Sequence, residues 1–133
     1  MKKLALFALL AVFTLLLTAC GGGKSTTKLD VTMTDFKYDM EDYTIAAGKE
    51  ITMNIKNDGA VLHEWVIMKY GLNIGDDFGD EDEDNIYWEV EVDPGASKTV
   101  TFTAPPDAGV YQIVCGTEGH FTAGMVTKLT VVK

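Results

Sequence analysis

The strongest constraint on the fold is an alternation of apolar and polar residues in several short runs. Ile51, Met53 and Ile55 alternate with polar residues in the segment 50–56, and the same period recurs in the segment 98–104. A period of two is typical of strands with one buried face. Turn-forming triplets such as Asn-Asp-Gly and Asp-Pro-Gly separate the runs. We therefore predict an all-β fold, an antiparallel β-sandwich of seven to eight strands, and no helix.

The N-terminus has the pattern of a secretory signal. Lys2 and Lys3 precede an apolar run over residues 4–17, which is shorter than the roughly 20 residues of a bilayer-spanning helix. The run ends in Leu-Thr-Ala-Cys20, which resembles the lipobox of bacterial lipoproteins. In such signals the chain is cut before the cysteine, and the cysteine receives the lipid.

These features divide the chain into three parts. We predict a lipoprotein signal peptide over residues 1–19, a lipidated Cys20 with a flexible tether over residues 20–28, and one domain over residues 29–133. An uncleaved membrane anchor is the alternative for the N-terminus. Both interpretations place the domain outside the cytoplasm, on the periplasmic side or the outer face of a bacterial cell membrane.

The charge of the chain is strongly acidic. Its formal net charge is −9 and it contains no arginine, so nucleic acid is not expected as a partner. Seven acids fall within residues 76–84 and predict a solvated loop. This segment contains part of a calcium-loop spacing, but Asn85 stands where such a loop requires glycine.

The residues that indicate chemistry are two histidines, one cysteine and one methionine. Cys115 precedes His120 by five residues, Met125 follows His120 by five, and His63 opens an earlier predicted strand. Each residue alone is typical of a core or a turn. Together, a thiolate, two imidazoles and a thioether favour copper over magnesium or calcium, and a His₂Cys set with a weak methionine is the blue-copper arrangement.

The region around these residues resembles the cupredoxins. The segment 109–125 carries the spacing Cys-x4-His-x4-Met, which within that family is most like the auracyanins, and Asn57 precedes His63 as in the family's first-histidine element. The resemblance implies a Greek-key sandwich and one type 1 copper ion. It also implies the copper ligands His63, Cys115, His120 and Met125.

Two residues beside the ligands are expected to influence the site. The family usually has asparagine after its first histidine, whereas this chain has Glu64. The backbone N–H of Glu64 can still reach the Cys115 sulfur, although an ionised carboxylate cannot donate a hydrogen bond. Gly116, directly after Cys115, completes the predicted surroundings of the ligands.

The function implied by this resemblance is one-electron transfer between redox proteins, with copper cycling between Cu(II) and Cu(I). The alternatives are a lipoprotein that binds, delivers or senses copper, and a sandwich that binds no metal. Enzyme activity is not expected, because both histidines are already used as ligands. No oligomerisation signal is visible, and we expect a monomer.

Partner binding is expected near His120. Val61, Leu62, Phe121 and Ala123 are predicted to form an apolar docking patch, with ordinary loop packing as the alternative. The acidic charge favours a basic partner such as a cytochrome. The alternative is that the acidic loop is only solvated and is repelled by an acidic membrane.

Overall fold

A computed structural model describes residues 26–133 of this chain. The predicted signal peptide over residues 1–19 and the lipid site at Cys20 lie outside the described residues. At the end of the predicted tether, Thr26 forms a β-bridge with Ile45, and the first strand begins at Lys28. Within residues 26–133, no helix has the length and apolarity needed to cross a bilayer.

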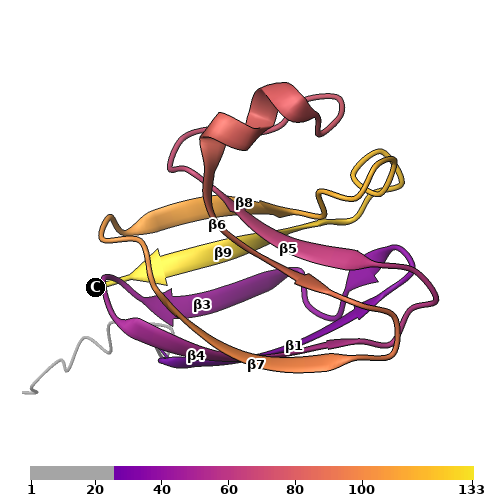
Figure 1. The fold of residues 1–133 in the computed structure, drawn as a ribbon. Coiled ribbons are helices and arrows are strands. Elements are labelled where there is room, and N and C mark those ends of the chain that lie inside the picture. Colours follow the sequence, from indigo (N-terminus) through magenta and orange to yellow (C-terminus); the bar gives the residue numbers. More distant parts are fainter. Residues whose placement is uncertain (1–25) are drawn as a thin grey trace, which may run out of the picture.

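Two β-sheets face each other and enclose the core (Figure 1). The first sheet has the strand order β2-β1-β4-β7 and the second has the order β3-β9-β8-β5-β6. The strands are β1 (Lys28–Thr34), β2 (Lys37–Tyr38), β3 (Asp42–Ala46), β4 (Glu50–Asn57), β5 (His63–Met68), β6 (Ile86–Val92), β7 (Ser97–Thr103), β8 (Gly109–Val114) and β9 (Val126–Val132).

The predicted all-β sandwich is confirmed, with two differences in detail. Residues 26–133 form nine strands rather than seven or eight, the shortest of them β2 with two residues. The sheets are mixed rather than purely antiparallel, because β1 pairs in parallel with β4 and β3 pairs in parallel with β9. The parallel pairs arise because the chain crosses from the first sheet to β3 in the second and returns to β4. Alternation reports which face of a strand is buried, and it carries no information on direction.

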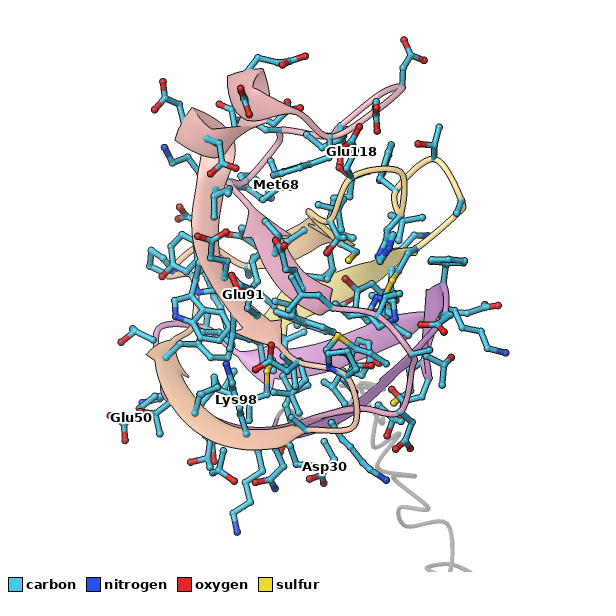
Figure 2. All side chains as sticks on the ribbon, turned by 45° about the vertical axis from the view of Figure 1, so that its right-hand side comes forward. Asp30, Glu50, Met68, Glu91, Lys98 and Glu118 are labelled. Carbon is cyan, nitrogen blue, oxygen red and sulfur yellow. The ribbon has the colours of Figure 1, made fainter. Side chains whose placement is uncertain are left out.

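The core is formed by the inward faces of both sheets. Ile51, Met53 and Ile55 of β4 are fully buried or nearly so, as their alternation predicts. Trp65 of β5 lies within this core and makes edge-to-face contacts with Tyr38 and Tyr43. The outward faces carry charged side chains, such as those of Asp30 and Glu50 (Figure 2).

The acidic segment between β5 and β6 is more ordered than a solvated loop. Residues Asp80–Asn85 form a short 3₁₀ helix, η1, with no buried residue. The preceding residues attach the segment to the outer face of the second sheet, where Ile74 and Phe78 pack in a small apolar cluster with Val66. The side chain of Gln112 also bonds the backbone of Ile74, accepting from its N–H at 2.6 Å. The acids are therefore exposed, but the segment that carries them is fixed.

We expect Ile113 and Val110 of β8 to differ sharply in their contribution to stability. Ile113 is fully buried, whereas Val110 on the same strand is 57% exposed. Ile113→Ala leaves a cavity and should lower the free energy of unfolding by about 2–5 kcal/mol. Val110→Ala should lower it by less than about 1 kcal/mol. Urea unfolding of both variants checks this, and equal losses would contradict the described orientation of β8.

Candidate metal centre

Three of the predicted ligands converge at one end of the sandwich. His63 is the first residue of β5, Cys115 follows β8 directly, and His120 lies in the loop between β8 and β9. Their ligand atoms all lie within 4.8 Å of one another. His63 and Cys115 are fully buried and His120 is 7% exposed. The fold thus gathers residues that are far apart in sequence into one enclosed group.

The distances within this group fit a single metal ion. The Nδ1 atoms of His63 and His120 are 3.1 Å apart, and the Cys115 sulfur lies 3.3 Å from His120 Nδ1 and 3.9 Å from His63 Nδ1. Nitrogen and sulfur atoms bound to one ion at about 2.0–2.3 Å would themselves be about 3–4 Å apart. Both imidazoles present the same nitrogen, Nδ1, to the group. The arrangement matches a trigonal His₂Cys site.

The loop between β8 and β9 holds two of these ligands and Met125. The backbone N–H of Met125 bonds the carbonyl of His120 at 3.0 Å, and the Cys115 N–H bonds the carbonyl of Met125 at 3.2 Å. Gly119 and Gly124 have φ values of +79° and +94°, a region that glycine adopts at little cost. Met125 is fully buried. The backbone therefore places Met125 beside Cys115 and His120, as the spacing predicts.

The loop before His63 is fixed by Asn57. The Asn57 side chain is fully buried and donates to the carbonyls of Val61 and Val92 at 2.8 and 2.9 Å. Its Oδ1 accepts the N–H of Gly59 at 2.8 Å. One buried amide therefore satisfies three backbone groups, which would otherwise be costly in the interior. This asparagine sets the path by which the chain enters β5 at His63.

Glu64 contacts the ligand loop through both its backbone and its side chain. Its N–H points to the Cys115 sulfur at 3.3 Å, as expected from the sequence. Its carboxylate accepts the hydroxyl of Thr117 at 3.3 Å. A Cβ atom at Gly116 would lie 2.5 Å from Glu64 Oε2, so the lack of a side chain at Gly116 makes room for this carboxylate. Glu64 thus braces the loop as an acceptor, whereas the usual asparagine of the family has a donor to offer.

Burial sets the protonation of the ligands. It raises the pKa of the Cys115 thiol, and the hydrogen bond from the Glu64 N–H only partly opposes this rise. It lowers the pKa of His120, and the neighbouring His63 lowers that pKa further. The His120 imidazole is therefore neutral and ready to bind a metal at neutral pH, whereas a metal must displace the proton of Cys115.

Two further residues at this end were not predicted from the sequence. Asp35 lies between β1 and β2, and its Oδ1 is 2.8 Å from His63 Nε2. Phe36 packs edge-on against His120 with 4.8 Å between ring centroids, and it is 44% exposed. Neither residue belongs to a ligand motif, and only the folded arrangement brings this turn to the site.

The residues of the predicted docking patch lie in the two loops that carry His63 and His120. Val61 is 41% exposed. Leu62 and Phe121 are partly buried and Ala123 is exposed. Phe36 adds its exposed ring to the same neighbourhood. Phe36 contacts the His120 ring, whereas Phe121 packs against the cluster of Val66 and Val114 on the outer face of the second sheet. The docking patch itself stays a prediction.

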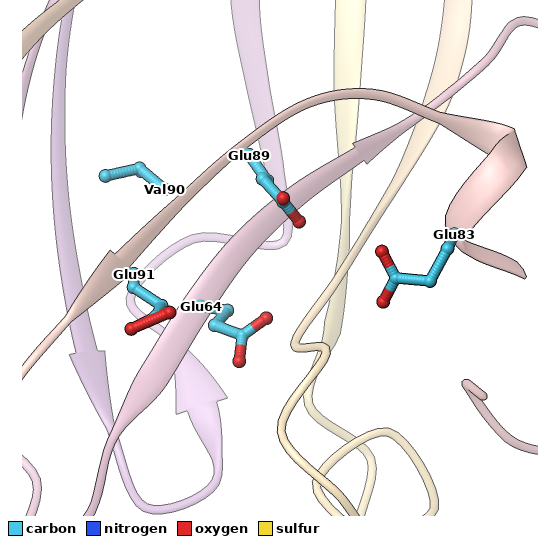
Figure 3. A pocket seen from close by; sticks show the side chains of 5 residues that line it. All are labelled: Glu64, Glu83, Glu89, Val90 and Glu91. Atoms are coloured by element: carbon cyan, nitrogen blue, oxygen red, sulfur yellow. The ribbon is translucent and has the colours of Figure 1, made fainter. Parts of the chain in front are cut away.

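Glu64 also lines an acidic pocket. Its volume is about 330 Å³, and it is lined by Glu64, Glu83, Glu89, Val90 and Glu91 (Figure 3). Glu64 and Glu91 are paired directly across β5 and β6, and like charges at such positions repel. Burial raises the pKa of Glu89, and Glu83 and Glu91 raise it further. The pocket's glutamates are not grouped closely enough to hold a metal ion. Among the described residues, the group with that arrangement is His63, Cys115 and His120.

Comparison with known proteins identifies the family. The family profile described as "Cupredoxin-like domain" matches residues 6–128. The chain belongs to the cupredoxin-like family. Auracyanin-A of Chloroflexus aurantiacus is 29% identical over 148 residues, which cover 90% of this chain and 91% of the relative.

Solved cupredoxin structures show the same fold. Dithionite-reduced auracyanin from Roseiflexus castenholzii has a TM-score of 0.69 and 29% identity, covering 82% of this chain and 99% of its own. Auracyanin A from Chloroflexus aurantiacus, described as a "blue" copper protein, has a TM-score of 0.61 and 25% identity. It covers 79% of this chain and 98% of its own. The predicted resemblance to cupredoxins, and to auracyanin among them, is confirmed.

We expect loss of the Asn57 amide to disturb both the fold and the site. Asn57→Ala leaves buried carbonyls and an N–H without partners and should lower the free energy of unfolding by about 2–4 kcal/mol. Asn54 on the same strand is exposed and bonds Asp30 at 2.8 Å. Asn54→Ala is therefore a matched control that should cost less than about 1 kcal/mol. Denaturant titration compares the two variants, and similar values would refute the role given to Asn57.

The acidic pocket predicts a pH dependence of stability. The pKa of Glu89 is raised in the folded chain, so the folded state holds this proton more tightly than the unfolded state. The resulting stabilisation is present below its folded pKa and is lost as the pH rises through it. Glu89→Gln should therefore raise the urea midpoint near pH 7, with a gain that shrinks toward about pH 4. Glu50→Gln in the other sheet is the control, and an equal gain there would point to net charge alone.

Proposed function

We propose that this chain is a blue copper protein that carries single electrons by cycling between Cu(II) and Cu(I). The observation that carries the proposal is the convergence of His63 Nδ1, His120 Nδ1 and the Cys115 sulfur in a buried group. A thiolate with two imidazoles excludes magnesium and calcium, and a buried methionine as the weak fourth ligand favours copper over zinc. We assign His63, Cys115, His120 and Met125 as the ligands of one type 1 copper ion.

The surrounding residues suit rapid electron exchange. Bound copper supplies a one-electron couple, and the protein's part is to hold the donor atoms still. His63 and Cys115 are fixed at the ends of paired strands, and the Glu64 N–H restrains the Cys115 sulfur. The ring of His120 packs against the exposed ring of Phe36. Electrons would therefore enter and leave through the His120 edge, where a partner can approach.

The family supports this assignment over an enzyme. One solved relative with 25% identity is described as a "blue" copper protein. We infer from the family match and the similarity to auracyanin that this chain is an electron carrier rather than an enzyme. The two histidines of the chain are both placed in the ligand group. Copper binding with electron transfer is therefore the function that this site supports best.

The location and partners follow from the sequence and charge. We propose that Cys20 is lipidated after removal of residues 1–19 and that the domain is held, as a monomer, at the extracytoplasmic face of a bacterial membrane. The chain has a net charge of −9, and four glutamates line one pocket near the site. A basic redox protein such as a cytochrome is the expected partner, because opposite charge accelerates encounter. Val61, Leu62, Phe121 and Ala123 would form the contact.

The visible spectrum of the copper-loaded protein tests the function. The full chain, extracted in detergent and given one equivalent of Cu(II), should show an intense thiolate-to-copper charge-transfer band. Reductant should bleach the band and oxidant should restore it. Cys115→Ser should abolish the band, because it removes the thiolate. Cys20→Ser, which changes the other cysteine of the chain, should retain it.

Other outcomes would support other functions. A colourless protein that binds Cu(I) tightly would favour copper delivery or sensing. A folded protein that binds neither ion would leave a metal-free sandwich and overturn the proposal. A band that survives Cys115→Ser would overturn the ligand assignment.

A further inference from the structure

The contact between Asp35 and His63 is not explained by the ligand motif. His63 is fully buried, and its two ring nitrogens face different partners. Nδ1 faces the Cys115 sulfur and His120, whereas Nε2 lies 2.8 Å from Asp35 Oδ1. A hydrogen bond from Nε2–H to the carboxylate leaves Nδ1 unprotonated, which is the form that binds a metal.

The position of Asp35 is itself fixed by the surrounding backbone. The backbone N–H of Ala60 donates to this carboxylate, with its nitrogen 3.0 Å from Oδ2 and 3.2 Å from Oδ1. About one third of the side chain, 32%, is exposed. Ala60 belongs to the loop that leads into His63, so one carboxylate bonds both the ligand and the loop that carries it.

Gly59 allows this close approach. A Cβ atom at Gly59 would overlap Asp35 Oδ1 and would lie 2.7 Å from His63 Nε2. Any larger residue there would push the carboxylate and the imidazole apart. The backbone at Gly59 therefore lies directly against the Asp35–His63 contact, which depends on the absence of a side chain at this position.

We propose that Asp35 is a positioning residue that holds His63 as the Nε2–H tautomer and, through its negative charge, lowers the reduction potential of the copper site. This inference rests on the proposed function. A carboxylate bonded to the outer nitrogen of a histidine ligand fixes the ring and makes its other nitrogen a stronger donor. A nearby negative charge also stabilises the more highly charged Cu(II) over Cu(I). Both effects act in the same direction on the potential.

The reduction potential tests the effect of the charge. Asp35→Asn keeps an oxygen that can accept from His63 but removes the negative charge. We expect the ratio of Cu(II) to Cu(I) affinity to fall about tenfold, which raises the potential of a one-electron couple by about 59 mV. Asp58→Asn is the matched control, because Asp58 lies in the loop that leads into His63 but pairs with Lys56 at 2.6 Å. That variant should shift the potential far less.

The tautomer of His63 tests the positioning role without copper. Long-range proton–nitrogen NMR of the ¹⁵N-labelled, metal-free full chain should show His63 as the Nε2–H form. Asp35→Asn should retain this tautomer, and Asp35→Ala should populate both tautomers. If Asp35→Ala fails to fold, Gly59→Ala separates the same two groups and should give the same mixture.

The two proposals fail in distinguishable ways. Wild-type protein without a charge-transfer band would overturn the proposed function, and the tautomer of His63 would still decide the positioning role. A blue wild-type protein whose potential changes equally in Asp35→Asn and Asp58→Asn would overturn the charge effect. An unchanged His63 tautomer in the variant that lacks the Asp35 contact would overturn the positioning role.

Discussion

Burial of the polar metal-binding side chains inside an apolar core is the constraint on which the site depends. His63 and Cys115 are fully buried, and an unpartnered polar group in such a place is costly. Hydrogen-bond partners for the two side chains come from separate segments. Asp35, which bonds His63, follows β1 in one sheet, and Glu64, whose N–H bonds Cys115, lies on β5 in the other. The same contacts that satisfy the buried ligands therefore hold the ends of the two sheets together.

The fold class and the ligand group were accessible from the sequence because both are encoded locally. Alternation depends on neighbouring residues, so the inward face of β4 was predicted correctly. Cys115, His120 and Met125 lie on one loop, and their spacing alone indicates that they meet. The backbone bond from Glu64 to the Cys115 sulfur also followed, because it depends on a position in the chain rather than on a side chain.

The features that sequence reasoning missed depend on long-range packing. The parallel pairs β1–β4 and β3–β9 are set by how the chain crosses between sheets, and no local pattern records that path. Asp35 and Phe36 stand in an exposed turn with no motif, yet the fold brings them onto His63 and His120. The acidic segment looked fully solvated because its charges dominate the pattern, although a few apolar residues, including Ile74 and Phe78, attach it to the sheet.

The loop between Cys115 and Met125 begins and ends on two strands that are paired with each other, with Val114 opposite Val126. The register of β8 against β9 is therefore set by the strands themselves and not by the loop that joins them. Of residues 116–124, Phe121 alone packs against one of the two apolar clusters, so the sandwich places few demands on the length and composition of this segment. Three of the four assigned ligands lie in this one segment or directly at its ends. In evolution, insertions or substitutions there can therefore change the donors of the metal site while the inherited fold remains intact.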